Sequence, residues 1–296
     1  PAIILLHGSG PLTRYSFGPY PHFFTSLGLA VLIFDKRGTG ESTGERMDAS
    51  TGTVMKSTYY PDDLANDALA ALQFLKQHKD IDPTRIGLWG SSEGGMLAVY
   101  VASKSDDVAF AINSSGFMEP LWKILEYQIG PLLRAAKASD SVIERQLSFV
   151  DLWLKVARSG NGWEEFQKQE DELIKTDGFS FFQSRGKYAS MDEMRWDWNH
   201  VLSFNPQPAL AKVGCPVLGL FGEVDPITPA ARTAEHMNRI LTEAGHKDFE
   251  VKVFAEGKQL ITDNPPTADI YLIDKQLTGI DGLSICRHLK SLPSTS

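Results

Sequence analysis

A serine flanked by glycines stands between an apolar run and a helical pattern near residue 90. The residues are Gly90-Ser91-Ser92-Glu93-Gly94, directly after the predicted strand 86–89. Gly-x-Ser-x-Gly in this setting is typical of a sharp strand-to-helix turn that lifts the serine hydroxyl above a sheet. A helix N-terminus there favours a developing negative charge. We interpret Ser92 as a nucleophile and the Glu93 N–H as an oxyanion donor; the alternative is a small-residue turn without a catalytic role.

A second glycine-rich segment follows the first apolar run of the chain. His7-Gly8-Ser9-Gly10-Pro11 comes directly after the predicted strand 3–6. Glycine lets backbone N–H groups approach a ligand closely. The N–H of Gly8 or Ser9 is therefore our candidate for the other half of an oxyanion hole, and a plain strand-to-helix turn is the alternative. We expect His7 to make a structural hydrogen bond rather than to act as a base.

Acidic residues follow two other predicted strands. Asp225 lies in the segment 222–229, after the apolar run 215–221, where a carboxylate can orient a histidine. Glu223 in the same segment, or a purely structural role for Asp225, are the alternatives. We expect the segment 35–38, Asp-Lys-Arg-Gly, to be an ion-pairing turn rather than a catalytic element.

The elements that must position these residues alternate between strand and helix patterns. The predicted strands cover residues 3–6, 29–34, 86–89, 108–112, 215–221 and 249–254, and the predicted helices cover 20–27, 62–77, 95–102 and 229–244. Alternation in this order predicts an α/β protein whose parallel sheet is covered by helices on both faces.

A long helical insertion interrupts the alternation. Residues 118–204 carry helical patterns, and we expect them to form a cap over the carboxyl edge of the sheet. Within it, the Gly130-Pro131 pair predicts a helix break, and Ser141 with Glu144 predicts a capping box that opens a helix. Five tryptophans line either an apolar acyl pocket or the cap's own core: Trp122, Trp153, Trp163, Trp196 and Trp198. The predicted domains are a core of residues 1–117 and 205–257, the cap, and a separate segment 258–296.

Four segments together resemble the α/β-hydrolase superfamily, in particular its bacterial cap-bearing esterase-like and peptidase-like serine hydrolases. They read LLHGSGP, VLIFDKRGTGESTG, RIGLWGSSEGG and CPVLGLFGEVD, and with their spacing they cover about residues 1–254. The resemblance implies an eight-stranded sheet, a triad in the order Ser, Asp, His, and no cofactor. Because Pro1 directly precedes the first strand, we expect the first two strands and the true N-terminus to be missing.

The histidine that this order requires is not at its expected place. After the strand 249–254, where the resemblance implies Asn-His, the chain has Lys258-Gln259, and neither side chain relays a proton near neutral pH as imidazole does. His200, near the end of the cap, is a possible substitute. His78 and His246 are expected at the opposite edge of the sheet, and His236 on an exposed helix face.

The sequence beyond the missing histidine has a different character. Residues 269–290 resemble the middle of a response-regulator receiver domain, with Asp274 at the phospho-acceptor position and Thr278 where proline is usual. Only about a third of such a domain is present, without the acidic pair and the lysine that receivers use, so we do not expect Asp274 to be phosphorylated. We interpret the chain as a hydrolase fragment joined to a receiver fragment near residues 250–258, either as an artificial chimera or as a natural fusion.

Composition limits the remaining function classes. The 296 residues include 29 Lys and Arg against 37 Asp and Glu, a net charge of −8, which argues against nucleic-acid binding. No apolar run approaches a membrane span, and the two cysteines are too few for a disulfide framework. The compartment is not predicted, with the cytoplasm slightly favoured, and neither is the oligomeric state.

The predicted function is hydrolysis of small carboxylic esters or related acyl compounds through an acyl-enzyme, impaired by the missing histidine. Thioesterase and peptidase activities stay open. The alternatives are an inactive hydrolase-like scaffold and, less favoured, a signalling fusion that uses Asp274.

Overall fold

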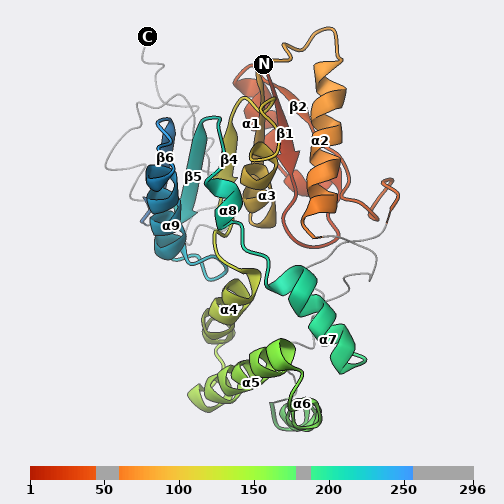
Figure 1. Ribbon diagram of the computed structural model, residues 1–296, viewed down its shortest axis with the longest axis vertical. Helices are drawn as coiled ribbons and strands as arrows, with labels where there is room; N and C mark the ends of the chain where they lie inside the picture. The colour runs from red at the N-terminus through yellow and green to blue at the C-terminus, as the bar shows by residue number, and fades with distance from the viewer. Residues whose placement is uncertain (45–59, 178–187, 256–296) are drawn as a thin grey trace.

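The core of the protein is a parallel sheet of six strands. The computed structural model describes residues 1–44, 60–177 and 188–255. Within these residues the strands are β1 (Ala2–Leu6), β2 (Ala30–Leu32), β3 (Ile86–Ser91), β4 (Ala111–Ser114), β5 (Val217–Gly222) and β6 (Phe249–Phe254). Their order across the sheet is β2-β1-β3-β4-β5-β6, and every neighbouring pair is parallel (Figure 1). All carboxyl ends therefore lie at one edge.

Helices cover both faces of this sheet. The helices packed on the strands are α1 (Tyr20–Ser26), α2 (Asp62–Lys76), α3 (Glu93–Ala102) and α9 (Ala230–Glu243), with the short helices η1 (Arg14–Phe17) and α8 (Gln207–Leu210) beside them. Side chains of β1 alternate between two apolar clusters: Ile4 packs with residues of α2 and α3, whereas Ile3 packs with Phe24 of α1. The predicted α/β class with a parallel sheet covered on both faces is confirmed.

The strand boundaries differ most from the predicted ones in β2 and β4. β2 is only three residues long, because its ladder with β1 ends at the pair Ile4–Leu32. β4 begins three residues later than predicted, at Ala111. The preceding Ala109 and Phe110 already make single backbone bonds with residues of β3, but the continuous pairing with both β3 and β5 starts only at Ala111.

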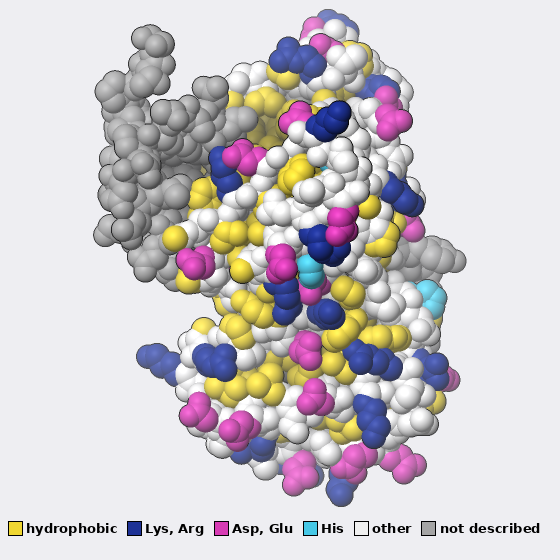
Figure 2. Space-filling view, turned by 60° about the vertical axis from the view of Figure 1, so that its left-hand side comes forward, with side chains coloured by type: hydrophobic (Ala, Val, Ile, Leu, Met, Phe, Trp, Pro, Cys, Tyr) yellow, Lys and Arg dark blue, Asp and Glu magenta, His cyan; other side chains and the backbone are white. Residues whose placement is uncertain are grey.

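The insertion between β4 and β5 is helical, as predicted. It contains α4 (Leu121–Ala135), α5 (Asp140–Ser159), α6 (Trp163–Asp177), α7 (Met191–Asp197) and one π-helical turn, η3 (Trp198–Leu202). We call residues 121–202 the helical segment. Figure 1 shows it beyond the carboxyl ends of the strands, and Figure 2 shows the surface hollowed where it meets the rest of the molecule.

Two local predictions in the helical segment are wrong. Helix α4 runs through Gly130 and Pro131 without a break. The proline removes one backbone hydrogen bond near the end of the helix, while Ile129 and Leu133 on either side of it are buried in the core and keep the helical face in place. The N-cap of α5 is Ser139 rather than Ser141, and the Ser139 hydroxyl accepts a hydrogen bond from the Val142 N–H.

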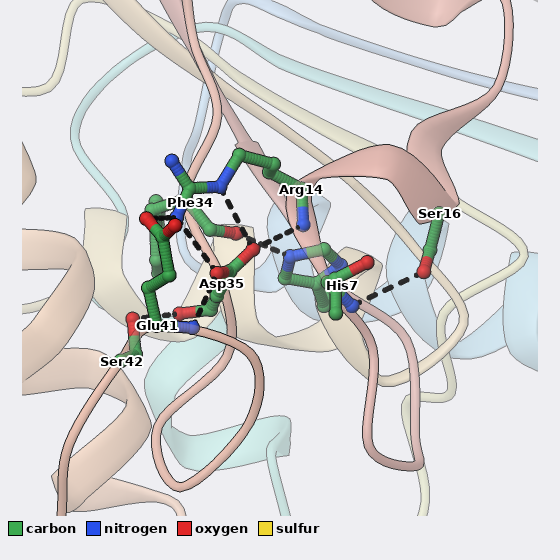
Figure 3. Close-up of polar contacts among 8 residues, drawn as sticks. His7, Arg14, Ser16, Phe34, Asp35, Glu41 and Ser42 are labelled. Carbon is green, nitrogen blue, oxygen red and sulfur yellow. Dashed lines mark hydrogen bonds and ion pairs between the residues drawn. The ribbon is translucent and has the colours of Figure 1, made fainter.

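The turn after β2 is built on ion pairs, as predicted for residues 35–38. The buried carboxylate of Asp35 accepts hydrogen bonds from the backbone N–H and the guanidinium of Arg14 and from the N–H of Glu41 (Figure 3). The Arg14 guanidinium holds the pKa of Asp35 well below its usual range. Gly40 has φ 60°, and a Cβ there would collide with this carboxylate. The turn is therefore fixed at the sheet's carboxyl edge.

None of the helices within the described ranges combines the length and the apolar character that crossing a bilayer requires.

Candidate active site

Ser92 occupies the turn between β3 and α3. Its φ of 57° and ψ of −123° are rarely adopted by residues other than glycine, and the neighbouring Ser91 and Glu93 belong to the strand and the helix themselves. The Ser92 N–H donates to the Ser114 carbonyl of β4. A strained residue held between a strand end and a helix start is the geometry that Gly-x-Ser-x-Gly predicts for a nucleophile.

The two glycines of the motif are required by close backbone contacts. A Cβ at Gly90 would overlap the carbonyl group of Gly94, and a Cβ at Gly94 would overlap the carbonyl oxygen of Leu6 in the neighbouring strand. Helix α3 thus starts in direct contact with the ends of β1 and β3. The glycines set the tight turn, and the turn sets the conformation of Ser92.

We expect Gly90→Ala to destabilise the protein by about 3 kcal/mol, because backbone atoms cannot move aside as a flexible side chain can. The measurement is the midpoint of urea unfolding. Gly214→Ala is the matched control, because a Cβ at Gly214 meets no atom within 4 Å. Equal unfolding midpoints for the two variants would contradict the steric account of the turn.

The loop after β1 lies against the serine turn. The register pairs Leu6 with Gly90, so the chain leaves β1 beside the end of β3. A Cβ at Gly8 would lie 3.6 Å from the Ser92 Cβ and 3.3 Å from the Ser91 carbonyl oxygen. The predicted oxyanion donors, the N–H groups of Gly8 or Ser9 and of Glu93, are therefore on the two segments that flank Ser92.

Asp225 lies in the turn after β5, and backbone N–H groups of the same turn hold its carboxylate in place. Oδ1 accepts hydrogen bonds from the N–H groups of Ile227 (2.7 Å) and Thr228 (3.0 Å). The Thr228 hydroxyl donates to the carbonyl of Ser115, which follows β4. Since β4 also holds Ser92 through Ser114, the serine turn and the acidic turn are tied to the same strand end.

Helix α4 supports the acidic turn, which the sequence did not indicate. The Tyr127 hydroxyl donates to the Asp225 carbonyl (2.9 Å), and the Gln128 amide donates to the Ile227 carbonyl (3.1 Å). Burial raises the pKa of Tyr127, and the nearby charge of Asp225 raises it further. Tyrosine and glutamine in an amphipathic helix carry no signal of such contacts, so only the fold identifies them.

His7 and His200 make their hydrogen bonds with groups other than Ser92. His7 bonds the Phe34 carbonyl at 2.6 Å (Figure 3) and stacks on Phe17, and burial lowers its pKa. It has the structural role that we predicted. His200 is exposed, stacks on Trp196 and bonds its carbonyl at 2.8 Å.

The other histidines lie away from the carboxyl edge or on helices. His78 and His246 precede β3 and β6, at the edge opposite the serine turn, as predicted. His236 is half-buried on α9 beside Gln207 rather than on an exposed helix face, because α8 packs against α9 there.

The predicted position of the catalytic histidine lies outside the described residues, as do Lys258 and Asp274. The strand that leads to it is described: β6 pairs with β5 up to Gly222–Phe254, and the Glu223 N–H donates to the Phe254 carbonyl. The chain therefore leaves β6 next to the turn that holds Asp225, which is where a histidine in this loop would be needed.

The tryptophans pack among the helices of the helical segment. Trp153 is fully buried, and Trp163 stacks on Phe166. Trp122 and Trp198 lie under the guanidinium of Arg158, at 4.3 Å and 4.9 Å from the ring centres. The contacts of Trp153 and Trp163 favour the interpretation of these two tryptophans as part of the segment's own core.

A comparison with known families agrees with this geometry. The alpha/beta hydrolase family matches residues 3–261, which include β1 from its second residue, β6 and every element between them. The chain belongs to the alpha/beta hydrolase family.

Individual members of the family are distant relatives. An uncharacterized 31.7 kDa protein of Escherichia coli, from the traX-finO intergenic region, is 28% identical over 235 residues, which are 77% of this chain and 74% of that protein. The esterase EstD of Thermotoga maritima is 32% identical over 160 residues, 51% of this chain but only 35% of EstD. The solved structure of a Pyrococcus furiosus esterase covers 88% of this chain and 75% of its own, with a TM-score of 0.51 and 18% identity, and so shows the shared fold.

Proposed function

We propose that this hydrolase is built to cleave small carboxylic esters through an acyl-enzyme on Ser92. The observation that carries the proposal is the strained backbone of Ser92 at the start of α3, next to the Gly8 loop. The esterase relative supports the substrate class, and related acyl compounds such as thioesters and peptides stay open. No cofactor enters the proposed reaction.

The proposed residues divide the reaction between them. Ser92 Oγ attacks the acyl carbon, the alcohol leaves, and water then releases the acid and restores the serine. The negative charge on the carbonyl oxygen is held by the N–H of Glu93 and that of Gly8 or Ser9. In the proposed reaction, Asp225 orients an imidazole that takes the Ser92 proton and gives it to the leaving oxygen.

Gln259 in place of the histidine predicts slow turnover in this chain. Removing the base from a triad leaves only the catalysis that the oxyanion hole and substrate binding provide. An inactive hydrolase-like scaffold is therefore the second candidate. We also propose that the helical segment caps the site and that residues 258–296 are a receiver-like addition; a signalling role through Asp274 stays the least favoured proposal.

The test is hydrolysis of p-nitrophenyl acetate by the full chain and by Ser92→Ala. We expect a low rate that falls at least about tenfold in Ser92→Ala, because the acyl-enzyme cannot form. Ser91→Ala is the matched control, since it removes the adjacent hydroxyl, and it should keep the parent rate. An equal rate in Ser92→Ala would refute Ser92 as nucleophile, and no rate in any variant would support the scaffold.

A further inference from the structure

A buried lysine connects the two segments that flank Ser92. Lys36, in the ion-pairing turn after β2, places its Nζ 2.5 Å from a carboxylate oxygen of Glu93 and 3.0 Å from the carbonyl oxygen of Gly8. The side chains of Lys36 and Glu93 are 5% and 1% exposed, so water does not replace either bond. The Lys36 ammonium group therefore bonds both segments that carry the proposed oxyanion donors, one through the Gly8 carbonyl and the other through the Glu93 carboxylate.

The bond to Gly8 has a consequence for the next N–H group. The peptide unit between Gly8 and Ser9 is planar, and in a trans peptide the carbonyl and the N–H point in opposite directions. Holding the Gly8 oxygen on Lys36 thus turns the Ser9 N–H away from Lys36. Within the described residues this N–H has no hydrogen-bond acceptor.

The bond to Glu93 fixes the other donor. Glu93 is the first residue of α3, so its N–H has no partner within the helix. Its side chain is held by Lys36 on one side, and the buried ring of Tyr60 lies beside its carboxylate on the other. A Glu93 side chain fixed in this way restrains the backbone that carries the second N–H.

Stability alone is a weak reason for such a pair. Taking two charges out of water is costly, and replacing a buried ion pair with apolar side chains is often neutral for stability. Nearby, Arg37 of the same turn pairs with Asp67 and Asp63 of α2; the Arg37–Asp67 pair is half-buried and makes no contact with Gly8 or Glu93 in the described structure. The Arg37–Asp67 pair can therefore be compared with the Lys36–Glu93 pair, which contacts the segments of the proposed site.

We propose that Lys36 and the Glu93 side chain are positioning residues that align the oxyanion hole. This inference rests on the proposed function, because it names the groups that position the proposed oxyanion donors. Lys36 and the carboxylate of Glu93 act through the backbone and do not touch substrate.

The test compares two double variants of the full chain, each also carrying Gln259→His to raise the measured rate. Lys36→Met with Glu93→Met removes the positioning pair without leaving a buried charge, and Arg37→Met with Asp67→Met is the matched control. The readouts are the melting temperature, kcat and KM for p-nitrophenyl acetate, and a crystal structure. We expect both to melt within about 5 °C of the parent, because buried pairs are replaceable.

The expected difference lies in kcat. A misaimed oxyanion donor should lower kcat about 10- to 100-fold in the Lys36 and Glu93 variant, with KM changed less than about threefold, because alignment acts on the transition state. The control should keep the parent kcat. A folded Lys36 and Glu93 variant with parent kcat would overturn the inference.

Two further results separate this inference from the proposed function. Parent turnover that persists in Ser92→Ala refutes the proposed function alone. The crystal structure then decides the inference without turnover: a rotated Gly8–Ser9 peptide in the Lys36 and Glu93 variant supports it, and an unchanged peptide overturns it.

Discussion

Gln259→His should raise kcat/KM for p-nitrophenyl acetate by about 100-fold or more, because a positioned general base contributes about 10²- to 10⁴-fold. The structural reason is the path of the chain: β6 ends beside Glu223, so the loop that follows starts next to the Asp225 turn. The gain should disappear on acidification through about pH 6.5, where imidazole takes up a proton and can no longer accept one from Ser92. The measurement is the pH–rate profile of the variant against the parent.

Two variants check where this gain comes from. Lys258→His moves the imidazole by one residue and should give a much smaller gain, and Gln259→His combined with Ser92→Ala should give none. A fast parent that Gln259→His does not improve would mean that another base already serves Ser92. His200→Ala would then be the next variant, although the structure shows His200 on Trp196 at the surface.

The sequence was sufficient to predict the regular alternation of strands and helices. Apolar strands alternating with helical patterns predicted the parallel sheet, because β1 and β3 are buried on both faces and read as unbroken apolar runs. It failed where tertiary contacts outweigh local preference. Pro131 stays within α4 since its neighbours are buried, and β4 starts late because its ladder depends on two partner strands.

The candidate site also contains residues that the sequence suggests and residues that only the fold shows. Ser92, Asp225 and the pair Gly8 or Ser9 could be named as candidates because a turn motif or a strand end marks each of them in the sequence. The residues that hold them could not, since Tyr127 acts from a helix about 100 positions away from Asp225 and Lys36 reaches Glu93 across 57 positions. Contacts between distant segments leave no periodicity or spacing, so only the assembled fold shows them.

Asp225→Asn should have a much larger effect in the Gln259→His variant than in the parent chain. In the parent, which has no histidine at position 259 to orient, the rate should change less than about threefold. In Gln259→His it should lose most of the gain that the histidine brings, about 100-fold, because an amide favours the wrong tautomer of the histidine, an effect worth about 10⁴ in a complete triad. The measurement is kcat for p-nitrophenyl acetate in all four chains, read as a double-mutant cycle.

The local structure predicts that Asp225→Asn removes the charge and keeps the hydrogen bonds of the turn. The N–H groups of Ile227 and Thr228 bond the Oδ1 of Asp225, and the amide oxygen of asparagine can accept both bonds. The melting temperature should therefore stay within a few degrees, so that lost activity reports the charge and not the fold. Glu223→Gln is the matched control, because Glu223 is the alternative acid in the same turn and is exposed. If Glu223→Gln and not Asp225→Asn lowers the rate of the Gln259→His chain, the orienting carboxylate belongs to Glu223, and the turn supports it rather than Asp225.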